Sequence, residues 1–470
     1  MKKKALLSTV LAAAMVTGLL AGCGETSGDP SGNESSGQPE VSQDVPDSTP
    51  DSQSEDGAEP SGNGNESEDV PAYQSLLEID TLENPYVVFD HYWNPDDFEK
   101  AAIERYEAKY GEGTVTTNAI GWNKGIETMQ ANLAANAVSD LIFTEGNACF
   151  PGYVTKNYFQ PITQYIQQDL GSSFMDEASM NNFLYCDEYY VFTNNARTKP
   201  YLVAYYIPLF EDNGLETPGE LFAKGEWTWD KFIEYCDILT TDTDGDGTID
   251  QWGLGPRYKL GNFAYAAGIM SIEEIGNGFL KSNWDDENML KYFEFVTSLE
   301  TIQARAESND GWLGTGAMYI ETVAWEMANI AEDGTVSNNE DVSFVPLPTI
   351  DGSMARTPVW DNGYAIPNGA RNPLGGAVLA AMILDEYSKG LRAQQEQYLT
   401  EDELTLYYDC MANSVAQRKN SDLYEGVTMD YGEEEAKQGT PAATIVDTYK
   451  DVVKNEVKAY NDKLVEKMQK

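Results

Sequence analysis

The chain has 470 residues and carries 78 acidic against 30 basic side chains, a formal net charge of −48. So much negative charge excludes a role in binding the phosphate backbone of nucleic acids, and acid spread along the whole chain is typical of a protein that stays soluble at a cell surface. His91 is the only histidine, which excludes most histidine-based metal sites and any Ser-His-Asp triad that does not use it. We expect His91 to be a surface residue without a role.

The first 23 residues have the pattern of a targeting segment. Three lysines at positions 2–4 precede small and apolar residues at 5–21, a run too short for a stable membrane span. The run ends in Leu-Ala-Gly-Cys at positions 20–23, which resembles the lipobox of bacterial lipoproteins. We predict a lipoprotein signal peptide over residues 1–23, with a lipid such as palmitate on Cys23. An ordinary signal peptide that contains a cysteine is the alternative.

Residues 24–74 differ sharply in composition from the rest of the chain. They are rich in Ser, Gly, Asn, Pro, Asp and Glu, and the chain has no Lys or Arg between Cys23 and Lys100. Such a segment cannot bury enough apolar surface to offset its chain entropy, so we predict a disordered acidic tether. A tether behind a lipid anchor places the folded part at the extracellular face of the cell membrane.

The remaining chain is long enough for two domains, and its first elements alternate between strand and helix. A strand is predicted at residues 86–89. Asn94 is expected to cap the next helix, with Pro95 in its first turn and Gly111 as its stop. Apolar residues recur at every fourth position and give this helix one buried face: Phe98, Ala102, Tyr106 and Tyr110.

Two further strands are predicted at residues 115–120 and 140–144, separated by a helix that has Met129 on its apolar face. This alternation predicts an α/β fold, and ligands of open α/β sheets bind at the loops that follow the carboxyl ends of strands. Glu145 and Asn147 follow the third strand and are binding candidates by position.

The second half contains a β-type run at residues 201–207 and a helix with Thr228 as its predicted N-cap. Apolar residues line one face of that helix: Phe232, Ile233, Cys236 and Leu239. A long amphipathic helix begins at Ala442, and its apolar stripe is predicted to pack in the core. The stripe contains Val446, Tyr449, Val453, Val457, Tyr460 and Leu464.

Four cysteines remain besides Cys23, and none forms a CxxC or CxxH pair: Cys149, Cys186, Cys236 and Cys410. An exported protein can form disulfides between such cysteines, and buried free thiols are equally compatible with the sequence. We favour free thiols.

An Asp-rich loop at residues 242–250 is similar to an EF-hand calcium loop. Carboxylates occupy positions 1, 3, 5 and 9, glycine occupies position 6, and the Thr248 carbonyl occupies position 7. Position 12 is Gly253 in place of a bidentate Glu, so the ligand set is short. We predict a structural calcium ion and no catalytic cofactor; a solvated turn without metal is the alternative. The predicted ligands are Asp242, Asp244, Asp246, Thr248 and Asp250.

Five separated stretches, in order over about residues 73–470, together resemble the extracellular solute-binding proteins of ABC importers, of the sugar-binding type. They are the lipobox with its tether, FEKAAIERYEAKYGEGTV leading to DLIF, YLVAYYIPLFEDNGLETPGE with WTWDKFIEYCDILTTDTDGDGTIDQWGL, GTGAMYIETVAW, and VSFVPLPTIDG with WDNGYAIPNGARNP. The resemblance implies a two-lobed periplasmic-binding-protein-like α/β fold, with a hinge and a ligand cleft between the lobes.

Carried onto this sequence, the resemblance implies an N-terminal lobe at residues 75–193 plus 340–388 and a C-terminal lobe at 194–339 plus 389–470. It also implies a monomer that delivers its ligand to ABC transporter permease subunits.

Aromatic rings that stack on a sugar, with amides and carboxylates beside them, are the expected ligand-binding groups. Five tryptophans lie at predicted loops or strand ends, and packing in the core is the alternative for each: Trp93, Trp122, Trp312, Trp325 and Trp360. Trp325 and Trp360 match positions that often face the ligand in the family, and Asp361 follows Trp360. We interpret Trp229 and Trp252 as structural.

The sequence therefore predicts a non-enzymatic protein that binds a sugar or an oligosaccharide. A lipid-anchored secreted glycoside hydrolase is the alternative, because two carboxylates and aromatic subsites suffice for that reaction. A surface adhesin or structural lipoprotein is a third possibility, and it would need no cleft.

Overall fold

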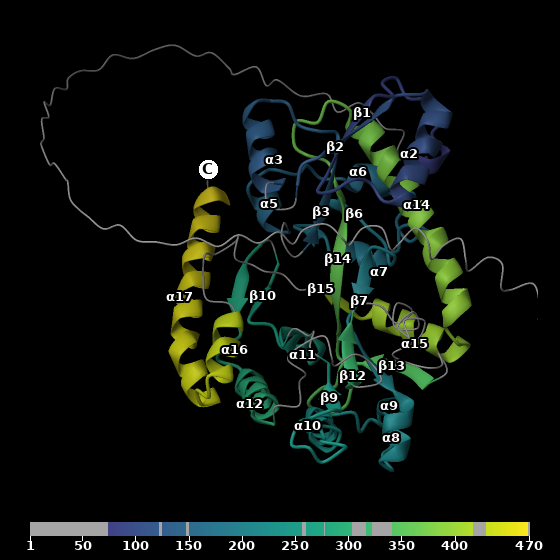
Figure 1. Ribbon diagram of the computed structural model, residues 1–470. Coiled ribbons are helices and arrows are strands. Elements are labelled where there is room, and N and C mark those ends of the chain that lie inside the picture. The colour runs from purple at the N-terminus through teal and green to yellow at the C-terminus, as the bar shows by residue number, and fades with distance from the viewer. Residues whose placement is uncertain are drawn as a thin grey trace, which may run out of the picture. The chain divides into compact units, whose positions relative to one another are not determined.

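The computed structural model describes residues 74–121, 125–146, 150–255, 260–276, 278–302, 316–321, 341–416 and 429–468. These residues belong to one compact unit, Glu68–Lys470. Within them lie a seven-stranded and a four-stranded sheet, each with its own buried core. We call the part built on the seven-stranded sheet the first lobe and the part built on the four-stranded sheet the second lobe (Figure 1).

The sheet of the first lobe has the strand order β15-β14-β3-β1-β2, and β6 and β7 also pair with β14. β1 runs parallel to β2 and β3, whereas β14 is antiparallel to β3. The strands predicted near residues 86–89, 115–120 and 140–144 are confirmed to within two residues at each end. The bounds are β1 Val87–His91, β2 Val115–Ala119, β3 Leu141–Glu145, β6 Val191–Phe192, β7 Thr198–Pro200, β14 Thr357–Ala365 and β15 Ser414–Ala416.

Helix α2, Asp97–Tyr110, begins at a different cap from the one predicted. Asp96, and not Asn94, accepts hydrogen bonds from two backbone N–H groups of the first turn, and the Glu99 side chain accepts from the backbone N–H of Asp96. This capping box satisfies N–H groups that the helix itself leaves unpaired. Gly111 ends the helix as predicted, with a φ of 126°.

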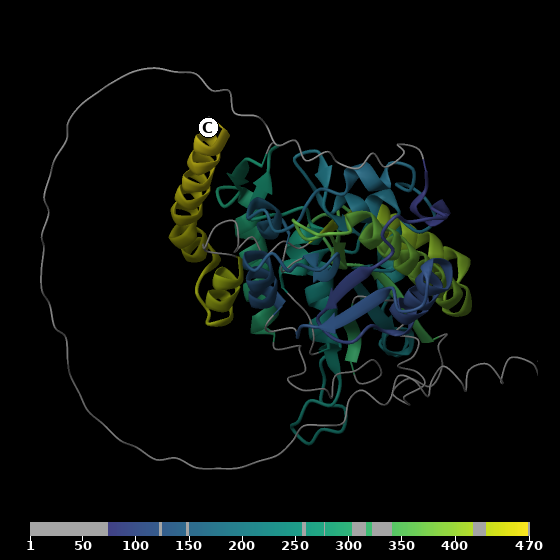
Figure 2. The ribbon, with the colours of Figure 1, turned by 90° about the horizontal axis from the view of Figure 1, so that it is seen from above.

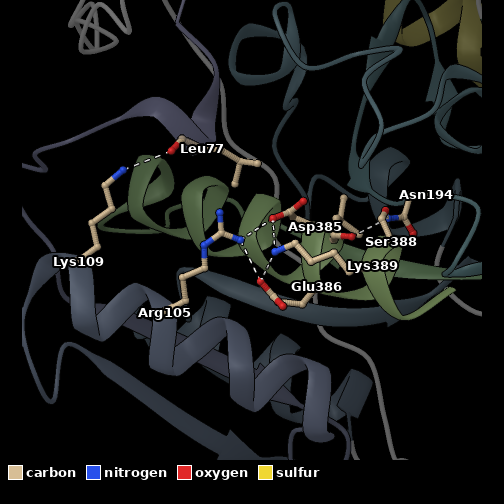
Figure 3. Close-up of polar contacts among 9 residues, drawn as sticks. Leu77, Arg105, Lys109, Asn194, Asp385, Glu386, Ser388 and Lys389 are labelled. Atoms are coloured by element: carbon tan, nitrogen blue, oxygen red, sulfur yellow. Dashed lines mark hydrogen bonds and ion pairs between the residues drawn. The ribbon is translucent and has the colours of Figure 1, made fainter. Parts of the chain in front are cut away.

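Helix α14, Pro373–Tyr398, packs along α2 (Figure 1). Of the face predicted for α2, Ala102 and Tyr106 are fully buried, whereas Phe98 is 37% exposed. An ion network joins the two helices at their outer edge: Arg105 Nη1 lies 2.5 Å from Asp385 Oδ2 and 3.0 Å from Glu386 Oε1 (Figure 3).

Two segments connect the sheets. In the first, the Asn194 amide nitrogen donates at 3.0 Å to the Ser388 hydroxyl (Figure 3) and, at the same distance, to the carbonyls of Phe174 and Leu384. The second is residues 347–356, which lead from the four-stranded sheet into β14; the first half of β14 pairs with β7 and β15 and its second half with β3 and β6 (Figure 1). The first connection is thus tied to the first lobe before the chain enters the other sheet.

The sheet of the second lobe has the order β13-β8-β12-β9. β13 pairs with β8 along its whole length, so the predicted boundary at residue 340, which put this segment in the first lobe, is wrong here. By the same criterion, β7 and β15, which the prediction assigned to the second lobe, lie in the first-lobe sheet; the other lobe boundaries stay a prediction. The bounds are β8 Leu202–Tyr206, β9 Trp252–Leu254, β12 Gly316–Glu321 and β13 Val342–Pro346.

Helix α10, Trp229–Ile238, confirms the prediction made for this part of the chain. The Thr228 side chain caps it, and Phe232 and Cys236 are fully buried. Trp229 is structural, as predicted: its ring stacks on Phe295 with centroids 4.6 Å apart. The other helices of this lobe are α8 Ile207–Asp212, α9 Pro218–Lys224, α11 Gly261–Ala266 and α12 Glu287–Thr301.

The chain ends in α17, Ala442–Met468, which runs beside α16 and the β10–β11 hairpin (Figures 1 and 2). Val453 and Val457 of the predicted stripe are buried in the second-lobe core, as is Ile445. The remaining elements are η2 Leu76–Glu78, α3 Gly125–Ala134, α5 Gly152–Thr155, α6 Thr163–Ile166, α7 Glu177–Asn181, β4 Leu184–Tyr185, β5 Glu188–Tyr189, β10 Ile272–Glu274, β11 Leu280–Ser282, α15 Glu401–Ala412 and α16 Met429–Lys437.

Three cysteines carry free thiols, as predicted: Cys186 is exposed, and Cys236 and Cys410 are buried. Cys149 lies outside the described residues. No helix in the described part of the chain has both the length and the apolar character needed to cross a membrane.

Candidate functional site

The carboxyl ends of β1 and β3 lie at the same edge of the first-lobe sheet, because these two neighbouring strands are parallel. Trp93 follows β1 and is 52% exposed, and its ring centroid lies 6.2 Å from that of Phe143 in β3. Glu145 ends β3 and is 6% exposed. The structure therefore brings two of the predicted binding residues, Trp93 and Glu145, to one edge, which we call the carboxyl edge.

β14 supplies polar groups to the carboxyl edge. Asn362 is the direct ladder partner of Glu145, and Tyr364 is the partner of Phe143. Side chains of directly opposed residues lie on the same face of a sheet. Asp361, a predicted binding residue, precedes Asn362 and is fully buried.

Trp360 was expected at a loop or strand end, and this is wrong. It lies inside β14 opposite Lys199, whose ammonium nitrogen is 5.7 Å from the ring centroid. The ring is partly buried, and the Lys199 ammonium group lies over one of its faces. Trp360 remains close in sequence to the carboxyl edge without belonging to a loop.

A buried hydrogen-bonded cluster supports the carboxyl edge. His91 is 5% exposed, so its expected place on the surface is wrong. Its Nδ1 accepts from the backbone N–H of Trp93 at 3.0 Å, and its Nε2 lies 3.2 Å from Glu99 Oε1. Those two contacts assign the proton to Nε2. Tyr364 donates to the same Glu99 oxygen at 2.6 Å, so His91 positions the exposed Trp93 through a network rooted in α2.

Glu99 keeps its charge although it is only 1% exposed. Burial by itself raises the pKa of this carboxyl, but the hydrogen bond from His91, the charge of Arg197 and the Tyr364 hydroxyl together bring the pKa below its ordinary value. The anion is thus held by several donors and by one nearby cation.

The Arg197 guanidinium is surrounded by aromatic rings. Its central carbon lies 4.3 Å from the ring centroid of Tyr387, 5.2 Å from that of Phe143 and 5.6 Å from that of Tyr364. Burial lowers the pKa of Arg197, but the neighbouring tyrosines and Glu99 outweigh burial, so the group stays charged. Sequence reasoning named Asn362, with Asp361, as a partner for sugar hydroxyls, but it missed Arg197 and Tyr387; a lone arginine between two predicted strands was the one available signal for Arg197.

Four of the predicted binding residues lie outside the described residues: Trp122, Asn147, Trp312 and Trp325. The predicted lipidation site, Cys23, also lies outside them.

The Asp-rich loop folds around its own carboxylates. Asp242 accepts from the backbone N–H groups of Gly245 and Gly247, at 2.6 and 2.7 Å. These bonds, Gly247 first, lower the pKa of Asp242. One carboxylate oxygen from each of Asp242, Asp244 and Asp250 lies within 4.8 Å of the others. Hard oxygen ligands at this spacing fit a divalent cation such as calcium.

Of the predicted carboxylate ligands, Asp246 does not join this group of three. Instead, the Asp246 side chain accepts from the backbone N–H of Thr248 at 2.7 Å. The loop therefore gathers three of the four predicted carboxylate ligands, and the Thr248 carbonyl stays a prediction.

A sequence comparison with protein families identifies the class of this protein. The family of bacterial extracellular solute-binding proteins matches residues 92–387. This match covers more than half of the chain, and the chain belongs to that family. Comparison with curated proteins finds no match.

Solved structures of low sequence identity share the fold. The cyclic alpha-maltosyl-1,6-maltose binding protein of Arthrobacter globiformis is 14% identical, with a TM-score of 0.59, over 80% of this chain and 98% of that one. The lacto-N-biose-binding protein of the Bifidobacterium longum ABC transporter is 13% identical, with a TM-score of 0.58, over 80% and 98%. UgpB from Mycobacterium tuberculosis, solved with glycerophosphocholine, is also 13% identical, with a TM-score of 0.58, over 81% and 99%.

These similarities establish the fold as the two-lobed fold of periplasmic binding proteins. Since that fold carries a sugar in one relative and glycerophosphocholine in another, the fold alone does not name the ligand.

Proposed function

We propose that this protein captures a sugar or an oligosaccharide in the cleft between its lobes and delivers it to the permease of an ABC importer. The observation that carries the proposal is the half-exposed Trp93 ring at the carboxyl edge of the sheet, the edge at which the paired residues Glu145 and Asn362 also lie. A flat aromatic face suits the C–H face of a pyranose, and the carboxylate and amide suit its hydroxyls. Two of the three structural relatives bind oligosaccharides.

The family consists of binding proteins, and capture requires no catalytic base. The cluster beneath the carboxyl edge supports this interpretation, since the Glu99 carboxylate is occupied by His91 and Tyr364. A carboxylate held in this way orients its neighbours and does not serve as a general acid. We therefore propose binding without turnover, in preference to glycoside hydrolysis.

The experiment is a thermal-shift screen of the purified chain with maltotriose, lacto-N-biose and glycerophosphocholine, with product analysis in parallel. A ligand at a hundredfold excess over its Kd stabilises a protein by about 2.7 kcal/mol. Stabilisation by either sugar without product is the expected result. Product formation would favour the hydrolase, and stabilisation by glycerophosphocholine alone would redirect the ligand class.

Trp93→Ala tests the carboxyl edge. We expect weaker sugar binding with an unchanged melting temperature, because half of the ring is in solvent. Tyr86→Ala is the matched control, since Tyr86 is 67% exposed and lies before the opposite, amino end of β1. Equal affinity in both variants would remove Trp93 from the site.

We also propose that the protein acts as a monomer, held outside the cell by a lipid on Cys23 and by the 24–74 tether. Replacement of Cys23 by Ser is expected to release the chain from membranes into the medium. Retention of that variant in the membrane fraction would contradict the proposal.

For the Asp-rich loop we propose a structural calcium ion. Elemental analysis of the purified protein and a lower melting temperature in EDTA test it. Asp242→Asn is expected to abolish the EDTA effect, because Asp242 belongs to the group of three carboxylates. An identical EDTA effect in wild type and variant would place the ion elsewhere.

A further inference from the structure

The two lobes touch at a place other than their connecting segments. Tyr185 is the last residue of β4, next to the turn of the β4–β5 hairpin, and belongs to a buried first-lobe cluster with Ile142 of β3 and Val191 of β6. Its hydroxyl lies 3.5 Å from the hydroxyl of Tyr460 in α17. α17 packs in the core of the second lobe through Val453. This contact therefore crosses from one lobe to the other.

The Tyr185 hydroxyl packs against Gly278 of the second lobe. A Cβ atom built on Gly278, in the turn between β10 and β11, would lie 2.5 Å from the Tyr185 hydroxyl oxygen and 3.2 Å from its Cζ. Real Cβ atoms do not approach other atoms as closely as 2.5 Å. Any side chain at Gly278 would therefore push the hairpin and Tyr185 apart.

Both sides of the contact are held rigidly. On the second-lobe side, Asn461 of α17 exchanges two hydrogen bonds with the backbone of Leu280, at 2.9 and 2.8 Å, and Glu274 accepts from the Gly278 N–H at 3.1 Å. On the first-lobe side, Tyr185 is 8% exposed and its ring packs edge-on against Phe150. A clash introduced here is therefore transmitted to the lobes and not absorbed by a flexible side chain.

We propose that Tyr185, Gly278 and Tyr460 form a latch that holds the lobes together and sets the balance between open and closed forms. The inference rests on the proposed function in one respect: lobes that close on a ligand must separate to admit it, and separation breaks this contact. The apparent affinity for a ligand depends on the fraction of molecules in the binding-competent form. The latch would thus set affinity without touching the ligand.

The first test needs no ligand, because Cys186 reports the state of the latch. This exposed thiol adjoins Tyr185, and its pKa is raised by burial and then by the charge of Glu274 in the second lobe. Separation of the lobes removes the effect of Glu274, so the thiolate forms more readily and reacts faster. The measurement is the rate of labelling by a maleimide at pH 7.5, read at Cys186 by peptide mass spectrometry.

Gly278→Ala is expected to label several-fold faster than wild type at Cys186. Gly276→Ala is the matched control: Gly276 lies in the same turn with a positive φ of 103°, so the alanine meets similar backbone strain, but no atom lies within 4 Å of its Cβ position. We expect that control to label like wild type. Equal rates in the two variants would overturn the latch.

Tyr460→Phe covers the case in which Gly278→Ala fails to fold. It removes the hydroxyl contact and adds no atoms, so a smaller increase in labelling is expected. An unchanged rate in this variant, with Gly278→Ala unfolded, would also overturn the proposal.

The second test uses maltotriose as the probe. If wild type binds it, the Kd of Gly278→Ala is expected to rise roughly fivefold or more and that of Gly276→Ala to stay unchanged, since overpacking a rigid contact costs about 1–3 kcal/mol. An unchanged Kd in Gly278→Ala would contradict the proposal that the latch sets the affinity for the ligand. If wild type binds no sugar, the proposed function fails while the labelling rates still decide the latch.

Discussion

Two glutamates, one in each lobe, are buried to a similar degree and yet have opposite ionisation behaviour. Glu99 of the first lobe is 1% exposed and its pKa is lowered, whereas Glu433 of the second lobe is 8% exposed and its pKa is raised to about 7. Burial pushes both values upward, because a low-dielectric surrounding disfavours the anion. The difference therefore comes from the partners of each carboxylate.

Glu99 has three hydrogen-bond donors and a cation nearby. Its oxygens are contacted by His91 Nε2, the Tyr364 hydroxyl and the backbone N–H of Asp96, and the charge of Arg197 adds to them. These groups lie directly beneath the carboxyl edge. The charged cluster thus holds the candidate binding residues in a fixed position.

Glu433 of α16 has far less support. Among the described residues it accepts one side-chain hydrogen bond, from Tyr292 of α12 at 2.7 Å, and the negative charge of Asp430 opposes its ionisation. Burial is the leading cause of its raised pKa. The comparison shows that the ionised form of a buried carboxyl group is stabilised only when several hydrogen-bond donors surround it.

The largest expected effect comes from Glu99→Gln. Loss of the charge leaves Arg197 uncompensated and turns an amide N–H₂ toward at least one existing donor, so we expect a loss of about 3 to 5 kcal/mol in the free energy of unfolding. Urea unfolding at pH 7 measures it. A loss below about 1 kcal/mol would mean that the cluster does not depend on the anion, and the contrast with Glu433 would disappear.

Glu433→Gln is the matched substitution, with the opposite sign. Because the folded pKa, about 7, lies above the ordinary value of 4.5, the folded state holds this proton more tightly than the unfolded state. The resulting stability is complete below about pH 4.5 and is lost as the pH rises through about 7. The variant avoids that loss, so at pH 8 it is expected to be more stable than wild type by about 2 to 3 kcal/mol.

The measurement is the difference in unfolding free energy between wild type and Glu433→Gln at pH 5 and pH 8. The difference is expected to grow between these two values, because Glu433 of the folded state titrates in that interval. A difference that does not vary with pH would show that Glu433 ionises normally, and the two glutamates would then share one ionisation behaviour.

Local features of this fold followed from the sequence, and long-range ones did not. The Thr228 cap and the Gly111 stop were predicted correctly because each depends on residues within one helical turn. The Asn94 cap was wrong although Asp96 and Glu99 stand at the spacing of a capping box. The signal for the true cap is present in the sequence, two residues further along than the predicted one.

The carboxyl edge was predictable only in part. Trp93 and Glu145 were found because loops after parallel strands gather at one edge. Trp360 was misplaced because its strand contains Pro358 and Gly363, and pairing with neighbouring strands overrides that unfavourable composition. The cluster beneath was out of reach, since the partners Glu99 and Tyr364 are 265 positions apart in the chain.

The smallest expected effect sharpens the comparison by removing one donor at a time. Tyr364→Phe deletes one of the three donors to Glu99, and the others keep the anion in place, so we expect a loss of about 1 kcal/mol at pH 7. Tyr292→Phe deletes the donor to Glu433, and its cost is expected to be larger at pH 8 than at pH 5, because only the anion needs that donor. Urea unfolding of both variants at the two pH values distinguishes the cases. If Tyr364→Phe costs as much as Glu99→Gln, the Tyr364 hydroxyl alone holds the anion, and support shared among several donors is not what separates the two glutamates.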